Sequence, residues 1–386
     1  MRELFELEPG LAFLNHGSFG AVPKPVTEAL HAWQQRMERN PVQFLGRESA
    51  ARLLHAREQL AAFLGARAEH LVFVPNATTG VNLVARSLAL QAGDEVLGTT
   101  LEYGACDATW QRVCAARAAH YVRARIALPF VRESFVAQVM AAVTPRTRLL
   151  FVSHIASTTA LILPVADLVA AAHALGLPVL VDAAHAPGQL DVDLDAIGAD
   201  FTTGNCHKWL CAPKGTAFLH ARPEHHASLD ATVTSWGYVA GSGGHTGFDA
   251  YTGRSTLERR LQWQGTRDIC SCLAVAAAID FHRQHLTPAV RVQCHRQAVA
   301  LMADLARRFA LEPIGCDSDF AQMAPIPVPP CDAEALRKRL YEDHRVEVPV
   351  TQHEGRTFVR VSVQGNNSAD ELQRLREALL QAVQRQ

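Results

Sequence analysis

The stretch that decides the fold runs from Val179 to Phe218 and reads VLVDAAHAPGQLDVDLDAIGADFTTGNCHKWLCAPKGTAF. It opens with the short apolar run 179–181, which ends at the acidic Asp182 and is followed three positions later by His185. A run of this kind is typical of a buried parallel strand, and open α/β sheets bind their ligands at the carboxyl ends of such strands. The sequence therefore predicts a ligand site beside Asp182.

A second strand-like run covers 199–203 and also leads into polar residues. Asn205, His207 and Lys208 follow directly after the run breaks at a glycine. Because the carboxyl ends of neighbouring parallel strands meet at one edge of a sheet, we expect Asp182 and Lys208 to lie close together.

Residue types around Lys208 predict an amine that is available for covalent chemistry. Phe201, Trp209 and Leu210 are close to it in the sequence, and desolvation by such side chains lowers the pKa of a lysine. A carboxylate such as Asp182 keeps the nitrogen of a pyridine ring protonated, and a lysine Schiff base with an acidic partner is the arrangement that binds pyridoxal phosphate. A lone Asp or Lys is more often a turn cap or a surface residue, but the whole string favours the cofactor site.

Two strings in this region also resemble a known family. DAAHAPGQLDVDLDAIGADF and TGNCHKWLCAPKGTAFL resemble the cofactor-lysine region of class V aminotransferase-family proteins, and within that family the isopenicillin N epimerase-like branch, which is related to the cysteine desulfurases. LNHGSFGAVPKPV, PNATTGVNLV, LEYGA, WQGTRD and VRVSVQGNNSADEL follow the order of that family as well. The resemblance covers nearly the whole chain.

The resemblance implies an α/β fold, namely fold type I of the PLP-dependent transferases. In that fold a large domain with a mostly parallel seven-stranded sheet is joined to a smaller α+β carboxyl-terminal domain. We expect the large, cofactor-binding domain to span residues 18–265, and the small domain to combine the arm 1–17 with residues 266–386. The residues themselves support a parallel sheet, because a strand at 148–154 and a helix at 164–175 precede the strand that begins at Val179.

The stretch after the predicted strand 71–74 reads PNATTG and opens a helix. Free amides at a helix start together with two hydroxyls form an anion site, although capping alone explains one threonine equally well. The resemblance makes Ala77, Thr78 and Thr79 ligands of the cofactor phosphate. It assigns the same phosphate to Asn205 and His207.

Three further roles come from the resemblance. Tyr103 would stack on the cofactor ring, although a lone tyrosine is more often a packing residue. Arg360, on a predicted strand with apolar neighbours, would grip the substrate α-carboxylate with two parallel hydrogen bonds. His185 would contact the phenolic oxygen of the cofactor or shape the electronics of its ring.

Asn15 and His16 belong to a polar, glycine-rich loop that the resemblance places at the edge of the substrate pocket. His154 is either a core histidine or a pocket residue. Asn366 is close to Arg360 in the sequence and is a weaker candidate than Arg360 for binding the substrate. Thr266 would reach the cofactor phosphate of a neighbouring subunit, so the expected active unit is a homodimer.

The expected function is that of a PLP-dependent enzyme acting at Cα of a small amino-acid-like substrate. The expected reaction is epimerisation of the isopenicillin N epimerase type. Lys208 would hold the cofactor as a Schiff base, exchange it for the amino group of the substrate, and then remove the Cα proton. A carbon–sulfur lyase acting on a cysteine conjugate and an aminotransferase are the alternatives. A non-catalytic binding protein on the same fold is disfavoured by Lys208, Asp182 and His207, and a cysteine-persulfide mechanism is disfavoured because no cysteine follows Cys331.

Composition excludes other classes of protein. The 386 residues carry a formal net charge of −1 without a basic stripe, which argues against a nucleic-acid partner. No run approaches the eighteen or so apolar residues of a membrane span, and the amino terminus carries acids where a signal peptide is apolar. Nine cysteines without a repeated CxxC pair predict reduced thiols in a cytoplasmic enzyme and no metal site. The glycine-rich stretch 235–254 is expected to be a lid, an interface or a disordered loop.

Overall fold

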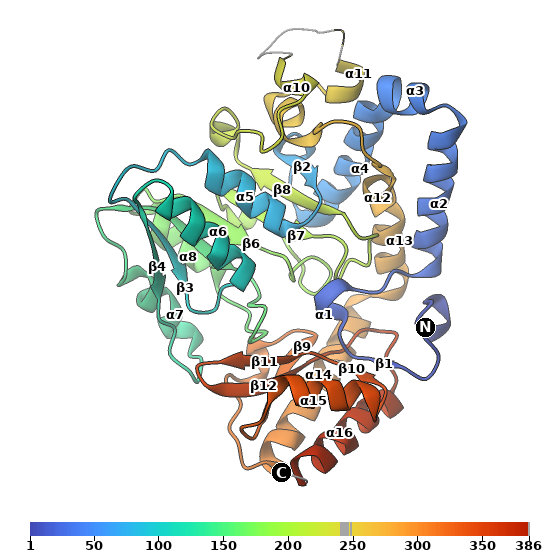
Figure 1. Ribbon diagram of the computed structural model, residues 1–386, viewed down its shortest axis with the longest axis vertical. Coiled ribbons are helices and arrows are strands. Elements are labelled where there is room, and N and C mark those ends of the chain that lie inside the picture. The colour runs from blue at the N-terminus through green and yellow to red at the C-terminus, as the bar shows by residue number, and fades with distance from the viewer. Residues whose placement is uncertain (240–246, 248, 385–386) are drawn as a thin grey trace.

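The computed structural model describes residues 1–239, 247 and 249–384, and its largest element is a seven-stranded sheet. The strands lie in the order β2-β8-β7-β6-β5-β3-β4 (Figure 1). They are β2 (Leu71–Val74), β3 (Glu95–Thr99), β4 (His120–Ala124), β5 (Thr147–Ser153), β6 (Val179–Asp182), β7 (Phe201–Asn205) and β8 (Ala217–Ala221).

Most neighbouring strands of this sheet are parallel, as the sequence predicts. β4, β3, β5, β6 and β7 pair in parallel, whereas β8 runs antiparallel to both β7 and β2. The runs expected at 71–74 and 179–181 are strands within one residue, and the run expected at 199–203 is shifted to Phe201–Asn205. This α/β architecture confirms the expected fold class.

Both faces of the large sheet are buried, because side chains along each strand alternate between two apolar clusters. Leu150 and Val152 of β5 join one cluster with residues of α4, α8 and α13. Leu149 and Phe151 join the other, with residues of α5 and α6. The helices of this part are α2 (Lys24–Arg39), α3 (Pro41–Gln43), α4 (Ser49–Leu64), α5 (Ala77–Ser87), α6 (Gly104–Ala115), α7 (Arg132–Met140), α8 (Val165–His173), α9 (Leu194–Ile197), α12 (Cys270–Leu273) and α13 (Val275–His285).

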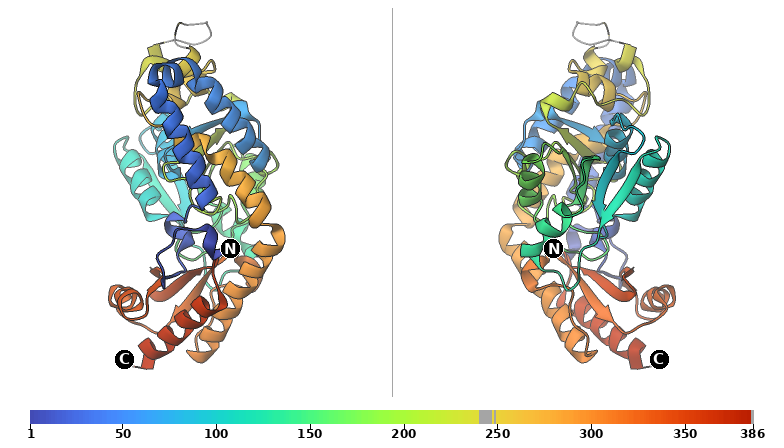
Figure 2. Two further views of the ribbon diagram at one scale, coloured as in Figure 1. Left: turned by 90° about the vertical axis from the view of Figure 1, so that its right-hand side faces the viewer. Right: turned by 90° about the vertical axis from the view of Figure 1, so that its left-hand side faces the viewer.

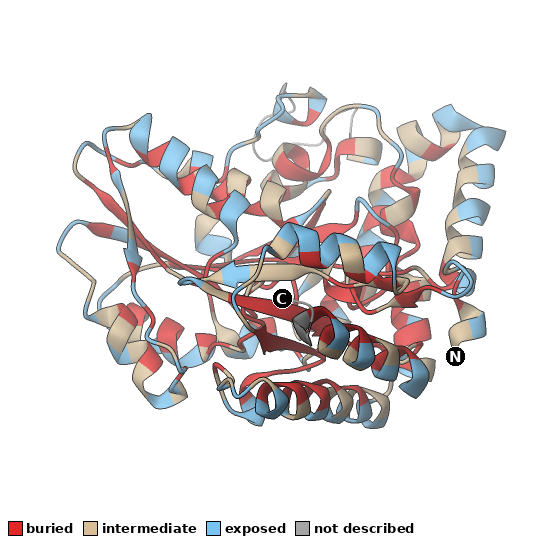
Figure 3. Cartoon of the chain, turned by 60° about the horizontal axis from the view of Figure 1, so that its bottom comes forward, coloured by how far each residue is buried: buried red, intermediate tan, exposed pale blue. Residues whose placement is uncertain are grey.

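A smaller α+β unit follows at the carboxyl-terminal end. Its three-stranded antiparallel sheet has the order β11-β12-β9, and Figure 3 shows buried strands behind helices whose outer faces are exposed. Figure 2 shows α13 and α14 running one after the other from the large sheet toward this unit. Its elements are α14 (Pro288–Arg308), β9 (Met323–Val328), α15 (Ala333–Glu342), β10 (Val346–Glu347), β11 (Val350–His353), β12 (Arg356–Ser362) and α16 (Ala369–Gln384).

The amino-terminal arm adds a strand to the smaller unit. β1 (Ala12–Phe13) pairs in parallel with β10, and the one-turn helix α1 (His16–Phe19) follows. The domain division expected at residues 17/18 and 265/266 stays a prediction. α12 and α13, which come after the second of these boundaries, pack on α2 and α4.

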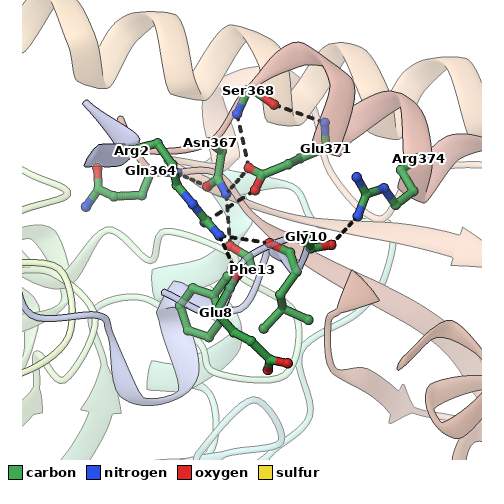
Figure 4. Close-up of polar contacts among 10 residues, drawn as sticks. Arg2, Glu8, Gly10, Phe13, Gln364, Asn367, Ser368, Glu371 and Arg374 are labelled. Carbon is green, nitrogen blue, oxygen red and sulfur yellow. Dashed lines mark hydrogen bonds and ion pairs between the residues drawn. The ribbon is translucent and has the colours of Figure 1, made fainter. Parts of the chain in front are cut away.

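Polar contacts hold the arm against the start of α16 (Figure 4). The guanidinium of Arg2 donates to the carbonyl of Leu11 at 3.0 Å and lies 3.3 Å from a carboxylate oxygen of Glu371. The amide of Asn367 donates both to Glu371 and to the carbonyl of Phe13, each at 2.9 Å. The arm is therefore hydrogen-bonded along its length before it reaches α1.

The glycine-rich stretch 235–254 lies partly outside the described residues. Its described parts include the short helices α10 (Trp236–Val239) and α11 (Asp249–Thr252). No helix among the described residues has both the length and the apolar character that crossing a bilayer requires.

Asp200, just before β7, joins β6 to α8 and to the short 3-10 helix Pro223–His225. Its carboxylate accepts hydrogen bonds from the Val179 amide and contacts the Nε2 atoms of His173 and His225, all at 2.8 Å. Burial raises the pKa of Asp200, but the hydrogen bonds from His225, His173 and Val179 outweigh it and lower the pKa to about 2.

Asp200→Asn therefore lowers the free energy of unfolding by about 1–2 kcal/mol at pH 7. Because the folded pKa lies below the unfolded one, this stability is present above about pH 4 and is lost as the pH falls toward 2. Urea unfolding of both proteins at pH 7 and pH 3 measures the difference, with the exposed Asp343→Asn as the control. An equal difference at both pH values would contradict the assignment.

Candidate active site

Asp182 and Lys208 line one cavity at the carboxyl edge of the large sheet. Asp182 is the last residue of β6, and Lys208 follows three positions after the end of the neighbouring β7. The cavity has a volume of about 350 Å³ and lies where parallel strands deliver ligand-binding residues. Its lining residues are Ser18, Phe19, Pro75, Asn76, Ala77, Thr78, Tyr103, Ser153, Ile155, Ser157, Asp182, Ala184, His185, Asn205, His207, Lys208, Lys214 and Gly215.

The carboxylate of Asp182 is buried beneath the cavity. Oδ1 accepts a hydrogen bond from the amide of Ala184 at 2.9 Å, and Oδ2 accepts one from the thiol of Cys106 at 3.6 Å. Burial raises the pKa of Asp182, while these two donors and the nearby Lys208 oppose the rise. A cation in the cavity would keep this carboxylate ionised.

Lys208 has the properties of a reactive amine. Burial and the nearby Arg360 lower the pKa of Lys208 to about 7, although Asp182 favours its charged form. At neutral pH a large fraction of this amine is therefore uncharged, which is the nucleophilic form. The loop that carries it is tightly packed, since a side chain at Gly188 (φ +91°) would lie 2.5 Å from the backbone of Trp209.

His185 orients the lysine. Its Nε2 lies 3.1 Å from the Nζ of Lys208, and its Nδ1 accepts a hydrogen bond from the indole of Trp209 at 3.4 Å. Burial, together with Lys208, holds the pKa of His185 well below its usual range. The neutral imidazole therefore carries its proton on Nε2 and directs it at the amine.

The amino-terminal end of α5 forms one wall of the cavity. Ala77 and Thr78 line it, but the amide of Ala77 already donates to the side chain of Asn205 at 2.9 Å. Thr79 does not line the cavity, because its amide and hydroxyl both bond the Asn76 side chain that caps the helix. His207 completes this wall, and burial lowers its pKa to about 4.

Arg360 of β12 lies beside the cavity on the smaller unit and is not among the lining residues, although its partners Ser157 and Ser18 are. Its Nη1 donates to the carbonyl of Ser157 and, at 3.2 Å, to the Ser157 hydroxyl, and its Nη2 lies 3.4 Å from the hydroxyl of Ser18. Burial lowers the pKa of Arg360 to about 10. Within the described residues no carboxylate pairs with this guanidinium, and its buried Nε has no partner. A buried cation of this kind fits an anionic ligand.

The amino-terminal turn contributes different residues from those expected. Asn15 bonds Glu347 and Ser18, at 3.1 and 2.5 Å, and His16 is fully buried against the Trp209 ring. Neither of the two lines the cavity, whereas Ser18 and Phe19 do. A one-turn helix points successive side chains in different directions, which the glycine-rich pattern did not predict.

The other candidates fall into two groups. Tyr103 lines the cavity and is 45% exposed, while Thr266 is exposed and is not among the lining residues. His154 and Asn366 are outside the lining as well, each with at least one buried side-chain atom that has no partner.

Glu102 is a site-adjacent residue that sequence reasoning missed. Its buried carboxylate accepts hydrogen bonds from the Thr99 hydroxyl at 2.6 Å and from the Ser153 amide and hydroxyl at 2.8 and 2.6 Å. Burial raises the pKa of Glu102 to about 8. The signal was an acid directly before Tyr103 in LEYGA, at the end of a strand.

A family model for class V aminotransferases matches residues 14–375 of the chain. The chain belongs to the class V aminotransferase family. It is 38% identical over 379 residues to an isopenicillin N epimerase of Streptomyces clavuligerus, covering 97% of this chain and 95% of that protein. An isopenicillin N epimerase of Amycolatopsis lactamdurans is 37% identical over 387 residues, covering 98% and 96%. A probable chloroplastic L-cysteine desulfhydrase of Arabidopsis thaliana is 27% identical over 409 residues, covering 96% and 83%.

Solved structures of similar fold extend the comparison. A variant of C-DES with glycine covalently linked to its PLP cofactor superimposes with a TM-score of 0.84 at 21% identity, covering 98% of both chains. The apo cysteine desulfurase of Thermococcus onnurineus NA1 gives a TM-score of 0.82 at 20% identity, covering 100% of this chain and 98% of that one. This member of the class V aminotransferase family thus has the fold type I of the PLP-dependent enzymes.

Pyridoxal 5'-phosphate is the cofactor of this class V enzyme, and the residues of the cavity fit it. A buried carboxylate suits the ring nitrogen, an uncharged amine suits the aldehyde, and the start of α5 with neutral polar side chains suits the phosphate. Among the described residues no group of three or more His, Cys, Asp or Glu side chains is arranged to hold a metal ion.

Lys208→Ala is expected to abolish covalent attachment of the cofactor, because Lys208 is the lysine whose amine lies beside His185, whereas the other lysine that lines the cavity, Lys214, donates to the carbonyl of Gly20. Borohydride reduction followed by mass spectrometry measures the covalently bound cofactor. The exposed Lys338→Ala is the control and should retain it. Reduced cofactor recovered on the Lys208→Ala chain would place the attachment site elsewhere.

Proposed function

We propose that this class V enzyme epimerises Cα of an amino-acid-like substrate, which is the type of reaction that the name of the isopenicillin N epimerases describes. The relationship that carries the proposal is the 38% and 37% identity to two such epimerases over nearly the full length of each chain. Desulfhydrases match at lower identity, for example 27% for the Arabidopsis relative. The pairing of Lys208 with Asp182 in one cavity supplies the chemical basis.

When bound, the cofactor supplies an electron sink for the electron pair that remains at Cα after deprotonation. The Nζ of Lys208 accepts the Cα proton, since its pKa of about 7 leaves it partly uncharged at neutral pH. Nε2 of His185, 3.1 Å away, orients that nitrogen. The carboxylate of Asp182 holds the proton on the ring nitrogen.

Other residues bind and orient. Thr78, Asn205 and His207 bind the phosphate, together with the amino-terminal end of α5, and Tyr103 stacks on the ring. Arg360 binds the substrate α-carboxylate, which supplies the anion that its buried guanidinium lacks in the described residues.

We also propose that the active unit is a cytoplasmic homodimer with the large and small domains divided as the sequence predicts. Thr266 is exposed at the start of the segment that leads to α12, so its hydroxyl is available to a second subunit. The seven buried cysteines are free thiols, which fits a reducing compartment.

A carbon–sulfur lyase is the second candidate, because L-cysteine desulfhydrases are among the relatives. A persulfide route through the smaller unit is disfavoured. The turn between β11 and β12 carries Glu354 and Gly355, and no cysteine follows Cys331.

Incubation with isopenicillin N and a panel of L-amino acids in deuterated water tests the reaction. Epimerisation predicts that one solvent deuteron enters Cα while the configuration at that carbon inverts, with neither keto acid nor sulfide released. NMR and chiral chromatography measure these products. Release of a keto acid or of sulfide, without inversion of Cα, would contradict the epimerase assignment and indicate an aminotransferase or a lyase.

Arg360→Gln is expected to lower kcat/KM for the substrate found in that assay by about 30- to 1000-fold, mainly through KM, because the carboxylate loses its buried partner. Arg356→Gln is the matched control on the same strand, since its guanidinium bonds the carbonyl of Glu312 and not the site. Steady-state kinetics with both variants measure the difference. Equal losses in the two would remove Arg360 from the binding site.

A further inference from the structure

The carboxylate of Asp182 has a contact to which no role has been assigned above. The thiol of Cys106 lies 3.6 Å from Oδ2, while Oδ1 is occupied by the Ala184 amide. Cys106 is fully buried on the first turn of α6, three residues after Tyr103. One oxygen of the carboxylate is therefore held by its own loop, and the other is held from a different element.

We propose that Cys106 is a positioning residue, whose thiol hydrogen-bonds Oδ2 of Asp182 and holds the carboxylate in the ionised form that pairs with the protonated ring nitrogen of the cofactor. The proposal depends on the cofactor and not on the reaction proposed above.

The pairing of β5 with β6 positions the contact between Cys106 and Asp182. Ser153, the last residue of β5, lies beside Asp182 in the sheet, and its amide and hydroxyl both bond the carboxylate of Glu102. Glu102 precedes the start of α6 by two residues. The end of β5 therefore anchors the first turn of α6, and with it Cys106, against the acid on β6.

The charges around Asp182 make a donor at this position effective. Glu102 faces it from the segment between β3 and α6, and Lys208 faces it from the loop after β7. Burial raises the pKa of Glu102 to about 8, so this neighbour is mostly uncharged at neutral pH. Burial, with Asp182 and Glu102 adding to it, also raises the pKa of the Cys106 thiol, which keeps the donated proton on sulfur.

Two protonation states of the Asp182–cofactor pair compete: an ion pair, with the proton on the ring nitrogen, and a neutral pair, with the proton on Asp182. The thiol of Cys106 stabilises the ionised carboxylate, so its removal destabilises the ion pair relative to the neutral pair. A hydrogen bond of this kind changes a binding or protonation equilibrium by about three- to tenfold.

The test compares Cys106→Ala and Cys106→Ser with the wild-type holoprotein loaded with ring-15N pyridoxal phosphate. In Cys106→Ala the 15N chemical shift moves toward that of an unprotonated pyridine, and the Kd of the apoprotein for the cofactor rises about three- to tenfold. In Cys106→Ser the hydroxyl returns both values toward those of the wild type. Should the alanine variant fail to fold, Cys106→Val, which removes the donor and fills the space, takes its place.

Cys114→Ala is the matched control, because Cys114 is buried on the same helix and packs in an apolar cluster. Its 15N shift stays at the wild-type value. An unchanged shift in Cys106→Ala, an equal shift in Cys114→Ala, or a serine variant that behaves like the alanine variant would each overturn the proposal. These measurements need no substrate, so their outcome is separate from that of the deuterium assay.

Discussion

The parallel pairing of β6 with β7 is the constraint on which the site depends. This pairing places Asp182 beside Thr203, so the loop that leaves β7 carries Lys208 over the end of β6. An acid and an amine that are 26 positions apart thereby face one cavity. A shift of β6 by one residue would turn Asp182 to the opposite face of the sheet, and the cavity would lose its acid.

The charged side chains of the site are destabilised in the absence of ligands, because burial disfavours the charged form of each main ionisable group. The pKa of Asp182 and that of Glu102 are raised, while those of Lys208 and Arg360 are lowered. In each case burial is the largest cause. In the proposed function, a ring nitrogen beside Asp182 and a substrate carboxylate beside Arg360 would supply counter-charges to these side chains. Binding of cofactor and substrate is therefore favoured by electrostatics already built into the fold.

Much of the large sheet could be predicted from the sequence, because its central strands are buried on both faces and appear as apolar runs. β4 was missed because HYVRA contains polar residues and lies at the edge of the sheet, where two of its five residues are exposed. β8 was missed as well, and with it the antiparallel edge. Local patterns also pointed to Lys208, Asp182 and His185, which the structure places in one cavity. They could not find the bonds from Ser153 to Glu102, because 51 residues separate the two and only strand order brings them together.

The turn at α1 shows why the substrate side was harder to predict than the cofactor side. Gly20 packs so closely that a side chain there would lie 2.4 Å from the carbonyl of His207, and its own carbonyl accepts a hydrogen bond from Lys214. Two residues earlier, the Ser18 hydroxyl contacts Arg360. One helical turn thus touches both the lysine loop of the large sheet and the arginine of the smaller unit. Because its role comes from contacts with two distant parts of the chain, a displacement of this turn would disturb the lysine loop and Arg360 together.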